Sequence, residues 1–315
     1  MARRRKPSDV NILLAVDKPL GLSSHDAVNR VRRQLDERRV GHAGTLDPLA
    51  TGVLVVGVGQ ATRLLGRLAL HRKRYLARIA FGTETLTDDA EGEVVRRVPA
   101  APELADERVA RRVLAGFLGP QEQVPPAFSA ISVDGVRSYQ RARAGEEVVL
   151  EARKIEVFGA ELVALEQTCE GPVWTVSFEV SKGTYIRTLA RDIGRAAQSA
   201  AHLDGLTRTA VGDIGLGSCL ALDGLDREAA LGAALDPVRA LGLRAFDIAE
   251  GALDGVLCGR ALRFCDAVPR DGVALPSEGV DAALVHAGEL RAIAVVEGGR
   301  LRMSDVFPQG IGGVR

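Results

Sequence analysis

Residues 41 to 52 read Gly-His-Ala-Gly-Thr-Leu-Asp-Pro-Leu-Ala-Thr-Gly. Three glycines and a proline within this stretch exclude a regular helix or strand, so the segment is predicted to be a loop. It runs directly into residues 53 to 58, an apolar and β-branched run typical of a central strand. A loop that leads into a buried strand is held by the core, and it presents His42 and Asp47 from a fixed position.

The segments on either side of this loop predict regular elements. Residues 12 to 16 have the apolar character of a short buried strand. A helix is expected to start at Ser23 or Ser24, because Ser23 and Asp26 are spaced as in a capping box. Alternating polar and apolar residues predict a further strand over residues 74 to 81.

The rest of the chain predicts an α+β protein in two parts. Helical spacing is found at residues 62 to 70, 104 to 118 and 185 to 197, and strand-like runs at 173 to 180, 282 to 286 and 290 to 296. Strands and helices without βαβ regularity indicate an α+β domain. We therefore expect a basic, disordered tip over residues 1–10, a large α+β domain over 11–243 and a small β-rich domain over 244–315.

Composition excludes several classes of protein. Hydrophobic residues make up 46% and charged residues 26% of the 315, which is the balance of a globular chain rather than a disordered one. No apolar run reaches the roughly 18 residues of a membrane helix, and no signal-peptide core follows the basic N-terminus. The four cysteines form no C-x-x-C pair, so neither a metal site nor a disulfide is expected, and the predicted location is the cytoplasm.

Charge is balanced overall but unevenly distributed. The chain has 41 Lys and Arg against 41 Asp and Glu. Residues 1 to 220 carry 31 basic and 27 acidic groups, whereas residues 221 to 315 carry 10 and 14. A basic run over residues 61 to 78 contains no acid. Such a run forms either an ordinary solvated face or a contact for a polyanion.

Motifs for nucleotide cofactors and metal ions are missing from the sequence. Residues 57 to 62 have threonine where a dinucleotide fingerprint requires its third glycine, and no P-loop pattern occurs. The acidic cluster at residues 88 to 92 lacks the alternating spacing of a calcium loop and is predicted to be an exposed turn. No metal and no cofactor are expected.

The remaining candidate residues have ordinary explanations when each is taken alone. Asp47 before Pro48 is typical of a turn whose carboxylate bonds to nearby backbone N–H groups. Arg187 could lie on a helix face, and Tyr75 could pack as a strand aromatic on the core. A lone histidine such as His42 more commonly braces a loop than reacts.

Together, these residues belong to motifs that occur in the order and at the separations of one family. The motifs are Val16-Asp-Lys-Pro-Leu-Gly-Leu-Ser-Ser24, the loop at residues 41 to 52 with Gly59-Gln-Ala-Thr62, Lys73-Arg-Tyr75 and Ser181-Lys-Gly-Thr-Tyr-Ile-Arg187. The pattern continues with Pro125-Pro126, Ser129-Ala130, Gly135, Tyr139 and Ala142-Arg143. Over residues 12 to 215 the chain resembles the bacterial tRNA pseudouridine synthase B family, and beyond residue 245 it loosely resembles the PUA-type domain of many members.

The resemblance implies an isomerase that converts the uridine at position 55 of the tRNA T loop into pseudouridine. The bond from C1′ to N1 is broken, the uracil turns, and C1′ is joined to C5, which needs no metal and no cofactor. The implied fold is a mixed, mostly antiparallel sheet with an RNA-binding cleft. The implied partner is the T arm of tRNA, without an obligate protein partner, and the chain is expected to be a monomer.

The resemblance also assigns roles to single residues. Asp47 is the expected nucleophile or base: it adds to C1′, adds to C6 or starts glycal formation, and the sequence does not choose among these. Arg187 is expected to pair with Asp47, and Tyr75 to stack on the uracil and take the C5 proton.

Further residues are expected to hold the RNA. His42 fills the gap left by the flipped base, and Tyr185 and Leu206 contact the uracil, while Lys18 supports the catalytic loop. The expected contacts to RNA phosphates are Arg63, Arg67, Arg72, Lys73 and Arg74.

The sequence departs from the family pattern in two places, and two rival functions remain open. Ser132 stands where many members have lysine, and Arg63 stands where lysine is common, which preserves the charge. One rival is a non-catalytic protein that binds or folds tRNA. The other is a synthase that acts on a different RNA.

Overall fold

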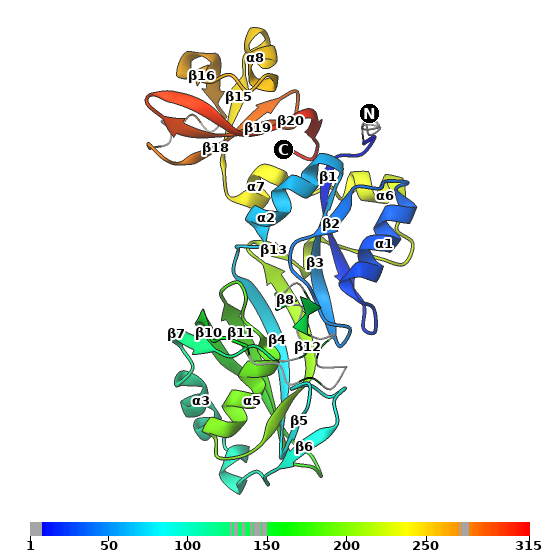
Figure 1. The fold of residues 1–315 in the computed structure, drawn as a ribbon, viewed down its shortest axis with the longest axis vertical. Helices are drawn as coiled ribbons and strands as arrows, with labels where there is room; N and C mark the ends of the chain where they lie inside the picture. The colour runs from blue at the N-terminus through cyan, green and yellow to red at the C-terminus, as the bar shows by residue number, and fades with distance from the viewer. Residues whose placement is uncertain are drawn as a thin grey trace. The chain divides into compact units, whose positions relative to one another are not determined.

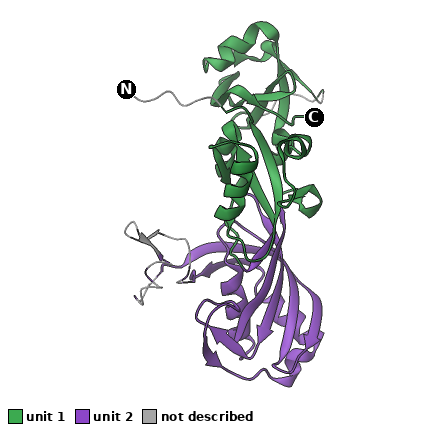
Figure 2. Ribbon diagram, turned by 90° about the vertical axis from the view of Figure 1, so that its right-hand side faces the viewer, with its two compact units in different colours: residues 1–48, 52–69, 212–315 green, residues 49–51, 70–211 purple. Residues whose placement is uncertain are grey.

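The computed structural model describes residues 8–126, 150–270 and 277–315, together with residues 128, 132–133, 136–138, 141, 146 and 272. The chain forms two compact units (Figure 2). Unit 1 contains residues 1–48, 52–69 and 212–315, and unit 2 contains residues 49–51 and 70–211. The chain therefore passes from one unit to the other directly after Pro48.

The amino-terminal part of unit 1 is built around strand β1 (Ile12–Lys18). On one side β1 pairs with β3 (Ala50–Val58) in antiparallel fashion (Figure 1). On the other side it pairs in parallel with β14 (Cys219–Ala221). The short strand β2 (Val40–His42) pairs with β3. The remaining elements here are α1 (Ser24–Gln34), η1 (Gly59–Leu64), α2 (Leu65–Leu68), β13 (Ile214–Gly215), η3 (Leu216–Ser218), α6 (Arg227–Gly232) and α7 (Pro237–Leu241).

The carboxy-terminal part of unit 1 is a β-sheet with its own core. Its strand order is β16-β20-β19-β18-β15-β17. The core contains Phe246, Leu284 and Leu301, all almost completely buried. The elements are β15 (Arg244–Ile248), η4 (Glu250–Ala252), α8 (Leu253–Leu257), β16 (Leu262–Arg263), η5 (Phe264–Asp266), β17 (Ala267–Pro269), β18 (Asp281–His286), β19 (Glu289–Glu297) and β20 (Arg300–Ile311).

Basic residues of η1 and α2 tie this carboxy-terminal sheet to the amino-terminal part of unit 1. Arg63 donates to the Asp305 carboxylate at 2.8 Å and to the Val306 carbonyl at 2.6 Å. Arg67 pairs with Asp281. Residues at the start of the basic run therefore bind acidic residues of this chain.

Unit 2 is an antiparallel sheet with helices packed against it. Its strand order is β12-β4-β11-β10-β7, and α5 lies against β12 while α3 lies against β10. The main elements are β4 (Lys73–Phe81), α3 (Glu107–Ala115), β7 (Gly119–Gln123), β10 (Arg153–Gln167), β11 (Pro172–Val180), α5 (Ile186–Ala196) and β12 (Ala201–Val211). The smaller elements are β5 (Thr83–Thr85), β6 (Val94–Arg97), η2 (Pro102–Ala105), β8 (Ser132–Val133) and β9 (Val136–Arg137).

Helix α5 approaches β12 closely because residue 194 is a glycine. A Cβ atom at Gly194 would lie 2.5 Å from the Cβ of Ala201, which is far inside van der Waals contact. Ile186, Leu189 and Ile193 recur at helical spacing and are buried. The helix is therefore fixed against the sheet, and with it the polar residues on its other faces.

The predicted fold class is confirmed: an α+β arrangement on a mostly antiparallel sheet, followed by a smaller β-rich part. The capping box at Ser23 and Asp26 is also confirmed. The predicted helix over residues 62 to 70 is partly wrong, because this segment begins as the 3₁₀ helix η1 and continues as the single turn α2. The loop expected over residues 41 to 52 is shorter, since β2 and β3 extend into both ends. The boundaries 11–243 and 244–315 stay predictions.

Candidate active site

The residues predicted to act together fall in both units. Lys18, His42 and Asp47 belong to unit 1, and Tyr75, Tyr185, Arg187 and Leu206 belong to unit 2. Each group is described within its own unit.

The backbone on both sides of Asp47 is held by hydrogen bonds. Ser24, the first residue of α1, donates its hydroxyl to the Leu46 carbonyl at 3.0 Å and accepts from the Leu46 amide at 2.7 Å. The amide of Gly21 donates to the Pro48 carbonyl at 2.9 Å. Because both neighbours of Asp47 are anchored, the backbone position of this half-buried residue is set by the fold.

Two glycines permit the path of this loop. Gly44 has a φ of 96° and Gly52 has a φ of 98°. Side chains with a Cβ rarely adopt this region, so the sharp bends before and after Asp47 depend on glycine. The repeated glycines quoted from the sequence therefore have a conformational explanation here.

Lys18 supports the same loop through the neighbouring turn at residues 19–22. Its side chain is completely buried, and Nζ donates to the carbonyls of Pro19 at 2.9 Å and Leu22 at 2.6 Å. These bonds shape the turn over residues 19–22, whose Gly21 amide in turn binds Pro48. Lys18 thus acts on the Asp47 loop through the backbone. His42 ends β2 opposite Val56 and is half-buried.

Tyr75 lies on the buried face of β4 in unit 2. It is 9% exposed, and it pairs with Phe178 of β11 on one side and Arg208 of β12 on the other. Leu206 pairs with Ala77, so Leu206 and Tyr75 are diagonal neighbours on the same face of the sheet. The register brings these two predicted residues together.

Two further cations lie around Tyr75. Arg208 is 1% exposed, and Lys73, two residues before Tyr75 on the same strand face, is also buried. Burial, together with the charges of Arg208 and Lys182, lowers the pKa of the Lys73 ammonium to about 8. Arg208 is not among the residues predicted from the sequence, because nothing local distinguishes it from the exposed arginines of the chain.

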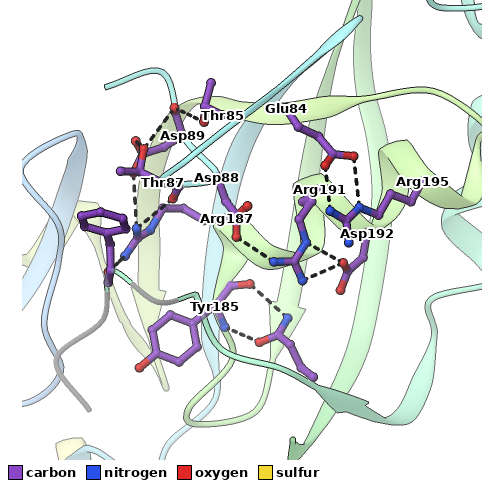
Figure 3. Close-up of polar contacts among 12 residues, drawn as sticks. Glu84, Thr85, Thr87, Asp88, Asp89, Tyr185, Arg187, Arg191, Asp192 and Arg195 are labelled. Carbon is purple, nitrogen blue, oxygen red and sulfur yellow. Dashed lines mark hydrogen bonds and ion pairs between the residues drawn. The ribbon is translucent and has the colours of Figure 1, made fainter. Parts of the chain in front are cut away.

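Tyr185 is held by a buried side chain from another strand. Its amide donates to Oε1 of Gln123 at 2.8 Å, and Nε2 of Gln123 donates to its carbonyl at 3.1 Å (Figure 3). Gln123 is 3% exposed and ends β7. One amide side chain therefore binds both backbone groups of Tyr185, the residue before α5, and the Tyr185 carbonyl also accepts from the Leu189 amide at 3.1 Å.

We expect Gln123→Ala to destabilise the protein by about 1–3 kcal/mol, because the half-buried amide of Tyr185 loses this acceptor, while the Tyr185 carbonyl keeps its bond from the Leu189 amide. Urea unfolding measures the effect. The matched control is Gln121→Ala on the same strand, which removes one bond to the Phe117 carbonyl. Equal stability of the two variants would contradict the expectation.

Arg187, in the first turn of α5, is oriented by two backbone carbonyls and a carboxylate. Nη1 donates to the Thr87 carbonyl and Nη2 to the Phe128 carbonyl, both at 3.1 Å. Nη1 also lies 3.5 Å from Oδ2 of Asp89 (Figure 3). The side chains of Arg187 and Asp89 are only 8% and 5% exposed, so this is a buried ion pair.

The prediction that the acidic cluster is an exposed turn is wrong for its first two residues. Asp88 and Asp89 are 7% and 4% exposed, and both face arginines of α5. Their partners lie about a hundred residues later in the chain, and no local pattern reveals such a pairing. Asp88 and Asp89 are therefore part of the interior of unit 2, while Ala90 and Glu91 of the same turn are exposed.

The basic residues predicted to bind phosphates lie in different environments. Arg63 and Arg67 pair with the carboxy-terminal sheet, as described above, and Lys73 is buried with Nζ donating to the His71 carbonyl at 2.7 Å. Arg72 is exposed, stacks over the Phe158 ring and lies 3.3 Å from Glu179. Arg74 is exposed on the opposite face of β4 from Tyr75.

Several further features concern ligands and membranes. Within the described ranges, no three His, Cys, Asp or Glu side chains are grouped as metal ligands. The part of the chain that the structure describes contains no helix with the length and apolar character needed to cross a membrane. Ser129, Ala130, Gly135, Tyr139, Ala142 and Arg143 of the quoted pattern lie outside the described residues.

Comparison with known proteins relates this arrangement to a family. Residues 32–186 match the family model described as "TruB family pseudouridylate synthase (N terminal domain)". The tRNA pseudouridine synthase B of Nocardia farcinica is 44% identical over 98% of both chains. That of Thermobifida fusca is 49% identical over 69% of this chain and 74% of its own.

Two solved structures share the fold. One is an H/ACA RNP bound to a substrate RNA containing 2′-deoxyuridine, with a TM-score of 0.68 and 22% identity. The other is a Cbf5-Nop10-Gar1 complex, with a TM-score of 0.67 and 24% identity. Each comparison covers 94% of this chain and 84% of the other. With the sequence identities above over nearly the whole length, the chain belongs to the TruB family of pseudouridine synthases.

Proposed function

We propose that this protein converts the uridine at position 55 of the tRNA T loop into pseudouridine. The observation that carries the proposal is the 44% identity, over 98% of both chains, to a protein named for tRNA pseudouridine formation. The glycosidic bond from C1′ to N1 breaks, the uracil turns within the site, and C1′ bonds to C5 while C5 loses a proton. The substrate and product have the same composition, so no cofactor is required.

Asp47 is the proposed catalytic carboxylate. Its loop is anchored at Leu46 and Pro48, which fits a group that must meet one atom of a bound nucleoside.

Arg187 and Tyr75 are the proposed partners of Asp47. A guanidinium oriented by two carbonyls presents its N–H donors in a fixed plane, which suits a carboxylate that must stay ionised near RNA phosphates. Tyr75 stacks on the uracil, a contact worth about 1–3 kcal/mol per base, and its hydroxyl takes the C5 proton. Leu206, its diagonal neighbour, closes the pocket together with Tyr185.

The target uridine must leave the folded T loop before these groups can reach it, at a cost of a few kcal/mol. His42 is proposed to fill the space that the base vacates. Arg72 and Arg74, both exposed, are the proposed phosphate contacts. Arg63, Arg67 and Lys73 contribute through the electrostatic field, since the structure gives each of them a contact within the chain.

The protein is proposed to act as a monomer without an obligate protein partner. Its four cysteines, all within the described part of the chain, are thiols rather than disulfides. This agrees with a reducing compartment, and we propose the cytoplasm.

The test is incubation of the purified protein with unmodified tRNA, without metal or nucleotide, followed by mapping of pseudouridine. We expect modification at position 55 alone, and none in a transcript whose T-loop uridine is replaced by cytidine. Product at another position, or only in a different RNA, would overturn the substrate assignment. Tight binding without product from a fully folded sample would favour a tRNA-binding or folding protein.

A further inference from the structure

Helix α5 carries three arginines on one face, each paired with an acidic residue of the segment 84–89. Arg187, Arg191 and Arg195 are spaced four residues apart, which places them in one row along the helix. Their partners are Asp89, Asp88 and Glu84, in the same order (Figure 3). We call these three pairs the arginine row. Only its first pair involves a residue of the proposed active site.

The second and third pairs of the arginine row are joined by direct hydrogen bonds. Nη1 of Arg191 donates to Oδ2 of Asp88 at 3.0 Å, and the side chains are 17% and 9% exposed. Arg195 binds Glu84 through two N–H groups, at 3.0 and 2.7 Å. Arg96 adds a bond at 2.6 Å to the same carboxylate. Although burial raises the pKa of Glu84, these hydrogen bonds hold it below its ordinary value.

Asp88 lies at the turn between Thr87 and Asp89, the two residues of this segment that contact Arg187. Its φ is 62°, in the left-handed region that aspartate and asparagine tolerate better than most residues. Its carbonyl accepts from the Leu203 amide at 3.0 Å. The residues on either side supply two groups that contact Arg187, the Thr87 carbonyl and the Asp89 carboxylate. A rotation at Asp88 would therefore move both.

We propose that Asp88 is a positioning residue of the pseudouridine synthase site: its ion pair with Arg191 fixes the turn over residues 87–89 against α5, and so holds the Arg187 guanidinium in its catalytic orientation. This inference rests on the proposed function for its activity readout. It assigns no contact between Asp88 and the substrate.

The charges around Asp88 make this device sensitive to pH. Four groups of α5 face it, the cations Arg187, Arg191 and Arg195 and the anion Asp192. Asp89 and Glu84 lie on its own segment, and Leu203 packs beside it from β12 between His202 and Asp204. Burial raises the pKa of the Asp88 carboxyl to about 6, against the opposing effects of Arg191 and Arg187.

Protonation of Asp88 below about pH 6 removes the charge that pairs with Arg191. The folded-state pKa lies above the ordinary value of 3.8, so the contribution of this group to stability falls as pH rises from about 4 to 6. At neutral pH the folded protein holds an ionised carboxylate against a burial cost. A neutral amide avoids that cost, and the variant Asp88→Asn is therefore expected to fold.

The test compares the wild type with Asp88→Asn, whose amide has the same shape and tolerates the same φ. Single-turnover rates on tRNA are measured from pH 5.5 to 8.5, with tRNA affinity measured separately. We expect the rate at pH 7.5 to fall by about 10-fold to 100-fold, as for a misplaced catalytic group. Affinity should change less than about twofold, and the rate loss of the wild type near pH 6 should be absent from the variant.

Three further variants separate positioning from general damage. Arg191→Gln removes the same ion pair, together with the contact of Arg191 to Asp192 at 2.9 Å. The double variant with Asp88→Asn should be no worse than Arg191→Gln alone, as expected for one shared interaction. Arg191→Lys keeps the charge and should retain most of the rate. The matched control Glu166→Gln removes an exposed carboxylate 3.0 Å from Arg78 in the same unit and should leave rate and pH profile unchanged.

Hydrogen exchange gives a readout that does not need activity. Protection factors for the amides of residues 84–92 should be lower in Asp88→Asn than in the wild type at pH 7.5, and should be unchanged in Glu166→Gln. If the wild type forms pseudouridine and Asp88→Asn matches it in rate and pH profile, or if the two single effects add in the double variant, the inference is overturned. If the wild type does not modify tRNA, the proposed function fails, and unchanged exchange in Asp88→Asn would still overturn the positioning role.

Discussion

Asp47→Asn is expected to abolish pseudouridine formation while tRNA affinity changes by less than about threefold. An amide has nearly the shape of the carboxylate, but it neither adds to a carbon nor accepts a proton at neutral pH. Removal of a residue of this kind lowers the rate on the order of 10⁴-fold or more. Single-turnover measurement with tRNA labelled at C5 of uridine records the loss directly.

The structure explains why binding should survive this change. The bonds that shape the loop belong to the backbones of Leu46 and Pro48 and to Ser24 and Gly21, and none of these groups is altered. The matched control is Asp223→Asn, a 91% exposed aspartate of the same unit, which should behave as wild type. Parallel loss of tRNA binding and stability in Asp47→Asn would instead identify a structural aspartate.

Local signals explain what the sequence predicted correctly about the fold. The capping box at Ser23 and Asp26 depends on four consecutive residues, and the loop around Asp47 depends on glycines that reappear in the structure with positive φ. Both features depend only on residues that are close together in the sequence. Strand β4 was likewise predicted from its alternation.

Elements and contacts that depend on distant residues were not predicted. Strand β12 is not predicted from the sequence, because Asp204, Gly205 and Arg208 interrupt its apolar pattern. Its extended conformation is instead stabilised by backbone pairing with β4. The burial of Asp88 and Asp89 depends on α5, a hundred residues away.

Lys73 shows a further limit of residue-by-residue interpretation. The sequence predicts the same role for Lys73 and Arg74, as contacts to RNA phosphates. A strand places alternate residues on opposite faces, so Lys73 shares the buried face of Tyr75 while Arg74 is exposed. Composition identifies basic residues, but the sheet decides which of them face solvent.

Substitution of Arg187 is expected to separate catalysis from stability. Arg187→Lys keeps one positive charge but loses the planar fork that meets the carbonyls of Thr87 and Phe128 at once. We expect the rate of pseudouridine formation to fall by about 10²-fold to 10³-fold, comparable to loss of an oriented donor in other active sites. A wild-type rate for Arg187→Lys would show that Asp47 does not depend on a guanidinium.

Arg187→Gln goes further, because it leaves the carboxylate of Asp89 buried without its cation. Removing one partner of a buried pair costs about 3–5 kcal/mol in the free energy of unfolding. The bonds that Asp89 accepts from the Thr87 hydroxyl and the Glu91 amide place the expected loss at the lower end. In the double variant with Asp89→Asn the buried charge is gone, so urea unfolding should show stability largely restored. The rate should stay low, because the guanidinium proposed to pair with Asp47 is absent. Recovery of both quantities together would assign Arg187 a purely structural role.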